Sequence, residues 1–417
     1  MDLPPGPSAP AAVQTFEWVA RPTALMRRCR ARYGEPFTLR TLWADAPMVL
    51  VSEPEDLRRI FTAGADRLHA GASSAILEPL AGARSILLLD GAEHIRQRRL
   101  MLPPFHGEAL TRWRGTIADL AAAELDRWKP GRPVETYRRM QQLTLEVILR
   151  VVFGGGDAEL RDAVRRTLDM TRSLPRLVAM SVIQNELTWR RFTREIARLD
   201  AVIDRRIDDA PRDGSVLALL REARHEDGSP PTRRELRDQL VTLLAAGHET
   251  TAGALGWALE RLARHPDVLD RLRRDGDEYR EAVIKEVLRL RPVLAVAPRK
   301  AMEPFELGGW TLPPGVHVTP CIYLTHRRPD LWPDPTAFRP QRFLDQPPRP
   351  YSFIPFGGGI RRCLGAAFAT LEMHEVLRAV ANRFDLVPDG ARPERMRRRA
   401  ITLTPARGGS VIPVASF

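Results

Sequence analysis

The chain has 417 residues, of which 44% are hydrophobic and 28% are charged, a composition typical of globular proteins and unlike that of disordered, collagen-like or disulfide-scaffold chains. Its formal net charge is +12, and Arg supplies nearly all the positive charge because only Lys129, Lys285 and Lys300 are lysines. Since the Arg residues are interspersed with Asp and Glu and do not alternate with aromatic residues, we expect no nucleic-acid partner.

Three cysteines, Cys29, Cys321 and Cys363, lie far apart and form no CxxC pair. They predict neither a zinc site nor a disulfide framework, which is typical of a reducing compartment. The N-terminus lacks the features of a signal peptide, and no stretch reaches the roughly 18 apolar residues of a membrane span. We therefore expect a cytoplasmic protein, and we expect it to be a monomer.

The N-terminal third is predicted to mix strands and helices after a Pro-rich arm at residues 1–20, which carries no membrane anchor. Short runs of β-branched and aromatic residues at 37–42 and 48–52 flank the turn signal Ala44–Pro47 and predict a hairpin. After this hairpin, the apolar residues recur at helical spacing. Helices are predicted from Pro54 onward, over 109–128, over 134–153, and over 157–208 with a break near Leu174.

A long helix is predicted from Thr232 to about Arg264. Thr232 and Glu235 have the spacing of a capping box, and Pro266 would end the helix. Helices of about thirty residues are unusual in globular proteins. Because this one contains internal glycines, we expect it to cross the core and to let another group approach closely.

The C-terminal third combines helices with short strands. A helix is predicted over Glu278–Leu290, and a hairpin strand over Trp310–Leu312 next to Gly308-Gly309. A last helix should run from just after Cys363 to about Phe384, before a β-like stretch from Ile401. With no internal repeat or linker, residues 1–417 are expected to form one mainly α domain with small β-sheets, of class α+β.

The segment around Cys363 is the most informative one. Three consecutive glycines precede it and permit a tight loop that brings backbone close to a flat ligand. A helix N-terminus at the cysteine, with Arg361 and Arg362 nearby, would stabilise a thiolate, which is a metal ligand or a nucleophile. A phosphate-binding loop is disfavoured because no Gly-Lys-Ser/Thr follows. A nucleophilic cysteine is disfavoured because His374 lies about three helical turns away, and the remaining alternative is an inert buried cysteine.

The same segment resembles the haem-binding loop of cytochromes P450, Phe-Gly-x-Gly-x-Arg-x-Cys-x-Gly. Six fixed positions match: Phe356, Gly357, Gly359, Arg361, Cys363 and Gly365. The resemblance implies the P450 fold, a triangular helical prism around haem b (iron protoporphyrin IX). It also implies that the Cys363 thiolate is the iron ligand.

Two further segments resemble the same family. Glu286 and Arg289 match its Glu-x-x-Arg pair, and Arg342 matches the third member of a structural clamp beneath the haem. In the long helix, Ala246 and Gly247 would leave a notch beside a planar cofactor, while Glu249 and Thr250 match the family's acid and alcohol. The resemblance implies that Thr250 hydrogen-bonds bound oxygen and that Glu249 resupplies protons. His248 occupies a variable position and receives no role.

A third group of matches concerns the haem propionates. His94 and Arg98 lie at i and i+4, on one face of a predicted helix, and both side chains can donate to an anion. In the family this pair binds the propionates. Arg299 and Arg361 match two further propionate-binding positions.

Taken together, the resemblance implies a monooxygenase that inserts one oxygen atom of O2 into an organic substrate. Because the chain ends soon after Cys363, we expect no fused flavin reductase domain. The electrons would come from NAD(P)H through a separate acidic ferredoxin or flavodoxin. Arg361 and Arg362, with Arg98 and Arg99, are predicted to form the basic face on which that partner docks.

The substrate-binding residues are predicted by family analogy in five segments that are aliphatic and poor in acids. The residues expected to line the pocket are Ile76, Leu77, Leu174, Ile183, Leu243, Leu294, Val296 and Ile401. They favour an apolar ligand such as a terpenoid, steroid, fatty acid or polyketide, among which the sequence does not choose.

Three other functions remain open at this stage. The first is a haem-thiolate enzyme that uses peroxide directly or performs a rearrangement, although such enzymes often lack the acid and alcohol that Glu249 and Thr250 supply. The second is a non-catalytic haem sensor or ligand carrier. The third is a nucleic-acid-binding protein, which would make every motif match an accident.

Overall fold

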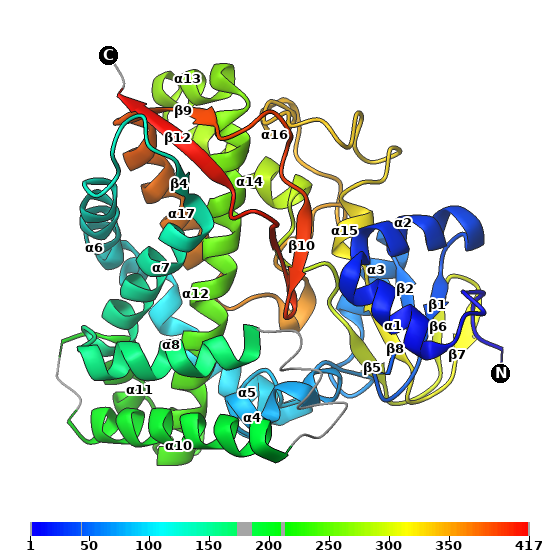
Figure 1. Ribbon diagram of the computed structural model, residues 1–417. Helices are drawn as coiled ribbons and strands as arrows, with labels where there is room; N and C mark the ends of the chain where they lie inside the picture. Colours follow the sequence, from blue (N-terminus) through cyan, green and yellow to red (C-terminus); the bar gives the residue numbers. More distant parts are fainter. Residues whose placement is uncertain (1, 43, 173–185, 210–212, 416–417) are drawn as a thin grey trace.

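The computed structural model describes residues 2–42, 44–172, 186–209 and 213–415 (Figure 1). Most of them lie in helices. The helices are α1 (Ala11–Ala20), α2 (Pro22–Tyr33), α3 (Pro54–Thr62), η1 (Ala72–Leu77), α4 (Glu78–Ala81), α5 (Gly91–Met101), η2 (Pro103–Phe105), α6 (Gly107–Leu125), α7 (Thr136–Phe153), α8 (Ala158–Arg172), α10 (Glu186–Asp208), α11 (Val216–Glu222), α12 (Arg233–Ala263), α13 (Pro266–Arg274), α14 (Gly276–Leu290), α15 (Ile322–Thr325), α16 (Arg342–Asp345), η3 (Gly359–Arg361) and α17 (Ala366–Ala381).

The strands form four small sheets. They are β1 (Phe37–Leu39), β2 (Met48–Val51), β3 (Leu68–His69), β4 (Val134–Glu135), β5 (Arg299–Ala301), β6 (Phe305–Leu307), β7 (Trp310–Leu312), β8 (His317–Pro320), β9 (Phe384–Pro388), β10 (Met396–Arg399), β11 (Thr402–Pro405) and β12 (Ser410–Ala415). The largest sheet has the order β1-β2-β8-β5-β3, and the others pair β4-β12-β9, β10-β11 and β6-β7. The predicted α+β class is confirmed.

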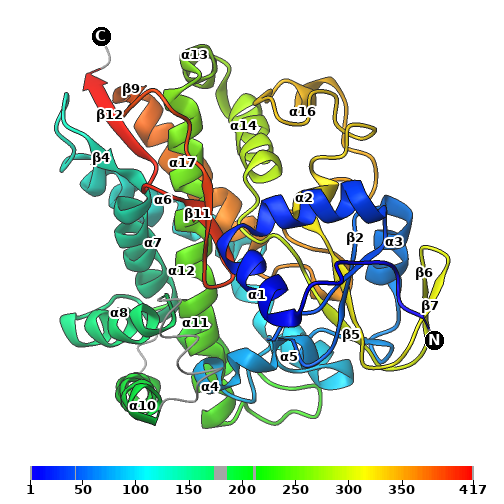
Figure 2. The same ribbon diagram turned by 45° about the vertical axis from the view of Figure 1, so that its right-hand side comes forward.

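The larger, helical part of the molecule surrounds α12, and the five-stranded sheet lies beside it with α1 to α3 (Figure 2). The main core contains buried side chains of α6, α7, α12, α14 and α17. Smaller cores form around β2, β8 and α3, and around α2 and β1. None of the helices within the described residues is long and apolar enough to cross a membrane.

Most predicted elements are present. The hairpin pairs Phe37 with Leu50 in antiparallel register, and the predicted helices correspond to α3, α6, α7, α8, α10, α12, α14 and α17. The predicted break near Leu174 lies outside the described residues. Two differences concern helix starts. Pro266 ends α12 as expected but also begins α13, because proline fits the first turn of a helix, and the N-terminal arm contains α1.

Helix α12 begins with the predicted capping box, in which the Thr232 hydroxyl accepts from the Glu235 N–H and the Glu235 carboxylate accepts from the Thr232 N–H. Two of its glycines allow α7 to pack closely against it. A Cβ on Gly256 would lie 3.2 Å from the Tyr137 Cα, and one on Gly247 would lie 3.1 Å from Ile148 Cδ1. The group that approaches α12 closely is therefore a neighbouring helix.

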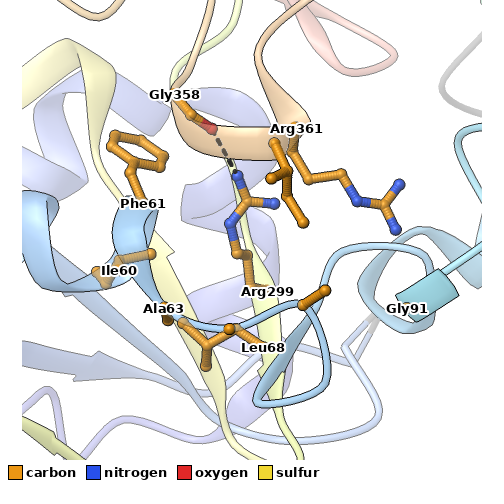
Figure 3. A pocket seen from close by; sticks show the side chains of 11 residues that line it. Ile60, Phe61, Ala63, Leu68, Gly91, Arg299, Gly358 and Arg361 are labelled. Atoms are coloured by element: carbon orange, nitrogen blue, oxygen red, sulfur yellow. Dashed lines mark hydrogen bonds between the residues drawn. The ribbon is translucent and has the colours of Figure 1, made fainter. Parts of the chain in front are cut away.

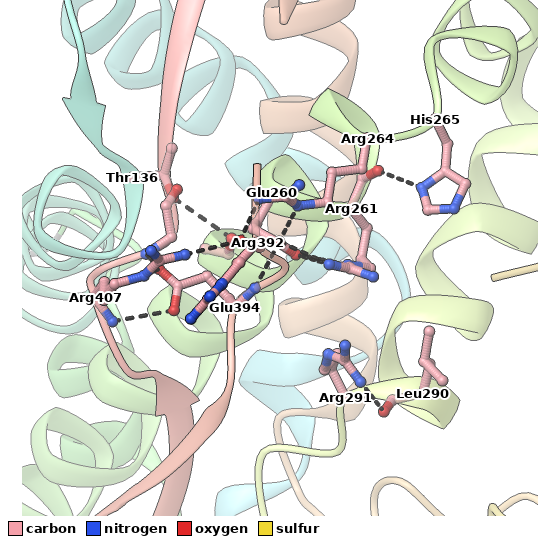
Figure 4. A network of polar contacts seen from close by, with 12 residues as sticks. Thr136, Glu260, Arg261, Arg264, His265, Leu290, Arg291, Arg392, Glu394 and Arg407 are labelled. Atoms are coloured by element: carbon pink, nitrogen blue, oxygen red, sulfur yellow. Dashed lines mark hydrogen bonds and ion pairs between the residues drawn. The ribbon is translucent and has the colours of Figure 1, made fainter. Parts of the chain in front are cut away.

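A polar network fixes the C-terminal end of α12 (Figure 4). The Glu260 carboxylate accepts from Arg261 Nε at 2.6 Å and from Arg264 Nε at 2.7 Å. Arg264 also donates to the carbonyl oxygens of Gly390, Ala391 and Arg392. These bonds tie the segment before β10 to α12, so the C-terminal strands have a fixed position relative to the central helix.

Candidate functional site

The loop that carries Cys363 is closed by backbone contacts. The Cys363 N–H donates to the Phe356 carbonyl at 2.9 Å, and Gly357 and Gly359 adopt positive φ values of 68° and 63°. A Cβ on Gly359 would lie 2.1 Å from the Phe61 carbonyl oxygen, and one on Gly358 would lie 2.6 Å from the Phe61 ring. Gly358 and Gly359 thus let the loop approach α3.

Cys363 differs from the other two cysteines because its side chain is exposed, whereas Cys29 and Cys321 are buried. Helix α17 begins at Ala366, three residues after Cys363. Although the side chain is exposed, the protein around it still desolvates the Cys363 thiol and raises its pKa, while the Gly365 N–H and the charges of Arg98 and Arg362 act in the opposite direction. Arg361, which was also expected to help stabilise the thiolate, donates to the Ile86 carbonyl at 3.0 Å and to Asp90.

Four cationic or protonatable side chains lie close enough to interact through their charges, and we call them the cationic cluster: His94, Arg98, Arg299 and Arg361. Of these, Arg98 also interacts with Cys363. His94 is 1% exposed, and its Nδ1 has no hydrogen-bond partner within the described part of the chain. Burial, together with the charges of Arg361 and Arg98, lowers the pKa of His94 to about 4. Burial also lowers the pKa of Arg98.

Arg299 lies at the base of a small pocket with Phe61, Gly358 and Arg361 (Figure 3). Its guanidinium lies 5.6 Å from the centre of the Phe61 ring and donates to the Gly358 carbonyl at 3.4 Å. Burial and the charge of Arg361 lower the pKa of Arg299 to about 10. The cluster therefore holds buried positive charge, with Asp90 as the carboxylate that contacts Arg361.

These residues fit a haem. A cysteine sulfur in an exposed position can bind haem iron. The cationic cluster, in which His94 Nδ1 has no hydrogen-bond partner among the described residues, matches carboxylates such as the propionates. The buried His94 Nδ1 without an acceptor is the observation that supports this fit. Where a protein buries several cations without matching anions, a bound anion lowers the free energy of the site.

The predicted clamp is assembled away from this cluster. Glu286 and Arg289 side chains are 0% exposed and share two bonds of 2.7 Å, and Arg342 Nε lies 3.3 Å from Glu286. Arg289 also donates to the carbonyl oxygens of His326, Pro335 and Ala337. All five N–H groups of Arg289 are thereby satisfied.

In the middle of α12, the structure separates the predicted acid from the predicted alcohol. Ala246 and Thr250 share one face, and the Thr250 hydroxyl donates to the Ala246 carbonyl at 2.6 Å. The Glu249 carboxylate accepts from the Tyr137 hydroxyl and from Gln141 Nε2 of α7. Gly247 contacts α7, so the predicted notch beside a cofactor is not what this glycine provides.

The predicted substrate-binding residues occupy several separate places. Ile76 and Leu77 lie on η1, with Ile76 55% exposed, and Ile401 is also exposed. Leu243, Leu294 and Val296 each pack against a different core. Leu174 and Ile183 lie outside the described residues. These contacts do not bring the described members together in one cluster.

The predicted basic docking face is smaller than expected. Arg361 is turned inward to Asp90, Arg98 is half-buried, and the exposed Arg99 pairs with Glu226. Arg362 is exposed next to Cys363. Sequence patterns identify the neighbouring pairs Arg98 and Arg99, and Arg361 and Arg362. They do not show which of these guanidinium groups point inward in the fold.

The sequence analysis did not identify two sets of residues that contact the predicted site residues. Asp90 precedes α5, where a sequence reading would assign it as a helix cap, yet its carboxylate accepts from the N–H groups of Gly71 and Ala72 instead. Tyr137 and Gln141 lie at i and i+4 on α7, a spacing that marks a shared face but names no partner.

The comparisons with known proteins agree with this geometry. The family model described as Cytochrome P450 matches residues 4–412. The chain is 40% identical to the putative cytochrome P450 135B1 of Mycobacterium tuberculosis, over 99% of this chain and 91% of that protein. It is 39% identical to the putative cytochrome P450 138 of the same species, over 98% and 96% of the two chains.

Solved structures show the same fold. The retinoic acid-bound cyanobacterial CYP120A1 matches with a TM-score of 0.89 and 25% identity, covering 100% of both chains. The haem domain of cytochrome P450DA matches with a TM-score of 0.87 and 22% identity, over 99% of this chain and 98% of that one.

Proposed function

The chain belongs to the cytochrome P450 family, and on that basis we propose that this P450 monooxygenase holds haem b through Cys363 and inserts one oxygen atom of O2 into an apolar small molecule. The observation that carries the proposal is the exposed Cys363 beside the cationic cluster. His94, Arg98, Arg299 and Arg361 would hold the propionates. Phe356, Gly357 and Gly365 shape the loop around the ligand.

When bound, the haem iron supplies the activation of dioxygen, which no side chain can perform. The Gly365 N–H lies by the Cys363 sulfur and favours its thiolate form. Glu286, Arg289 and Arg342 hold the segment around residues 335–342 against α14, and thereby support the loop that follows. These three residues have a structural role.

On α12, Ala246 and Thr250 share the face that would meet bound oxygen. The Thr250 hydroxyl, which donates to the Ala246 carbonyl, would hold a proton at this face. Glu249 would resupply protons from solvent. Its present partners, Tyr137 and Gln141, hold the carboxylate toward α7, so proton transfer to Thr250 requires the Glu249 side chain to change rotamer.

The substrate class rests on the aliphatic content of the segments named in the sequence. Ile76, Leu77, Leu243, Leu294, Val296 and Ile401, with Leu174 and Ile183, would line the pocket. They suit a terpenoid, steroid, fatty acid or polyketide. The similarity to a P450 whose structure contains retinoic acid, an isoprenoid with a long apolar chain and one carboxyl group, supports this class.

The electrons would come from NAD(P)H through a separate acidic ferredoxin or flavodoxin in the cytoplasm, delivered to a monomer. The exposed Arg362 next to Cys363 is the charge that supports this docking site. Because exposed charges are screened by salt, we expect the rate of ferredoxin-dependent reduction to fall several-fold between about 0.05 and 0.5 M NaCl. A rate that does not depend on salt would contradict docking through Arg362.

The decisive experiment is the difference spectrum of the dithionite-reduced protein with and without carbon monoxide. We expect a strongly red-shifted Soret band in the wild type and its loss in Cys363→Ala. Cys321→Ala is the matched control, because Cys321 is buried against Met26 and its pKa is raised to about 12. A band typical of His ligation in all three proteins, or no haem, would exclude the proposal.

A further inference from the structure

Asp90 occupies the junction between two parts of the site that the sequence places far apart. Its two carboxylate oxygens accept from the backbone N–H groups of Gly71 and Ala72, each at 2.9 Å. The same carboxylate accepts from Arg361 Nη2 in the Cys363 loop. The side chain is 14% exposed, so these contacts are made largely out of water.

A side chain at position 71 would not fit at this junction. A Cβ on Gly71 would lie 2.2 Å from the Leu88 carbonyl oxygen and 2.6 Å from Asp90 Oδ2. Gly71 and Ala72 open η1, whose last two residues are Ile76 and Leu77. The position of the Asp90 carboxylate therefore determines where this apolar segment begins.

The segment has a second anchor that does not involve Asp90. The Ser73 hydroxyl lies 2.9 Å from His317 Nδ1, and His317 Nε2 lies 2.6 Å from Asp45. Strand β3, which ends at His69, pairs with β5, and this pairing holds the preceding backbone even though His69 Nδ1 also lies 3.7 Å from Asp90 Oδ2. Loss of the Asp90 contacts would thus release the start of η1 without detaching the whole segment.

We propose that Asp90 is a positioning residue that links Arg361 of the Cys363 loop to the start of η1, and so controls how tightly the enzyme binds bulky apolar ligands. The inference rests on the proposed function. Asp90 touches neither Cys363 nor the apolar side chains of η1. It acts through Arg361 on one side and through the backbone of Gly71 and Ala72 on the other.

The test compares two ligands of haem iron that differ in size, imidazole and the bulky apolar azole clotrimazole, by spectral titration. In Asp90→Asn we expect the dissociation constant of clotrimazole to rise about five- to tenfold, the effect of losing a bond from a charged acceptor, and that of imidazole to change less than twofold. Gly71→Ala should give the same pattern, because its Cβ must displace the Leu88 carbonyl and the Asp90 carboxylate together. The double variant should be no worse than either single one.

Amide hydrogen exchange provides a second readout that needs no haem. We expect exchange at Gly71 and Ala72 to become at least about tenfold faster in Asp90→Asn, with or without haem, since each N–H loses a charged acceptor. The controls are Asp119→Asn and Gly115→Ala on α6, where Asp119 is exposed and a Cβ on Gly115 meets nothing within 4 Å.

The outcomes separate the two proposals. A wild-type protein without thiolate-bound haem would overturn the proposed function, while the exchange measurement would still decide whether Asp90 positions η1. Unchanged exchange at Gly71 and Ala72, or an equal loss of affinity for imidazole and clotrimazole, would overturn the role of Asp90.

Discussion

The clamp and the cationic cluster are both buried and rich in arginine, yet they differ in how their N–H groups are satisfied. In the clamp, Arg289 uses all five donors on Glu286 and three carbonyl oxygens. In the cationic cluster, His94 Nδ1 lacks an acceptor among the described residues, and Arg299 makes one long bond to Gly358. The clamp satisfies the N–H groups of Arg289 without a ligand, whereas the cationic cluster leaves His94 Nδ1 without a partner in the described part of the chain.

This difference shows how a buried charge can be assigned to folding or to binding. A buried ion that the protein itself neutralises stabilises one arrangement of the chain, and its removal leaves its partner uncompensated. In the cationic cluster, loss of hydration and the repulsion of neighbouring cations both disfavour the charged forms, which lowers the pKa values of His94 and Arg299 and holds His94 neutral near pH 7. Such a cluster is stabilised when an anionic ligand binds.

The largest effect should come from breaking the clamp. Arg289→Met leaves the fully buried Glu286 carboxylate without its main partner, so we expect the free energy of unfolding to fall by about 3–5 kcal/mol, or the protein not to accumulate as a soluble species. Denaturant unfolding measures this change. Arg194→Met, at an exposed position on α10, is the control. A loss below about 1 kcal/mol would mean that the clamp does not stabilise the fold.

A second effect follows from His94. Its pKa of about 4 lies below that of an unfolded histidine, about 6.5, so the unfolded chain binds more protons between these pH values. The free energy of unfolding of the haem-free protein should therefore fall as the pH is lowered from about 6.5 to 4, and His94 should contribute about 3 kcal/mol of that fall.

His94→Gln should flatten this part of the pH profile, which thermal or denaturant unfolding at several pH values would show. The exposed His106→Gln is the matched control and should leave the profile unchanged. The buried His326 also has a lowered pKa, so part of the dependence will remain in His94→Gln. Identical profiles for wild type and His94→Gln would show that His94 is not held neutral by the cationic cluster.

The sequence predicted features that depend on short spacings. The capping box at Thr232 and Glu235, the pair Glu286 and Arg289, and the hairpin around Ala44–Pro47 involve residues a few positions apart, so local geometry alone constrains them. The P450 fold followed from the resemblance of such segments. Helix α13 was missed because Pro266 was read only as a stop signal.

Side-chain direction could not be predicted, because it depends on partners distant in the sequence. Arg361 turns to Asp90, which lies 271 positions earlier, and Glu249 turns to Tyr137 on α7. Gly247 faces Ile148 because α7 packs closely on α12. The substrate-binding residues were the least predictable, since apolar composition does not distinguish a side chain that packs in the core from one that lines a pocket.

The smallest effect on folding should come from an Arg-to-Met substitution in the cationic cluster. It also tests most directly how this cluster differs from the clamp. Arg299→Met removes a buried charge whose pKa is lowered to about 10 and replaces it with an apolar side chain of similar length beside Phe61. In the haem-free protein we expect the free energy of unfolding to change by less than about 1 kcal/mol or to increase, because replacing an uncompensated buried ion is often stabilising. Haem transfer to apomyoglobin should nevertheless become faster, since a propionate would lose one of its cationic partners. If Arg299→Met destabilised the haem-free protein as strongly as Arg289→Met, Arg299 would belong with the clamp, and the distinction between a closed cluster and a ligand-binding one would fail.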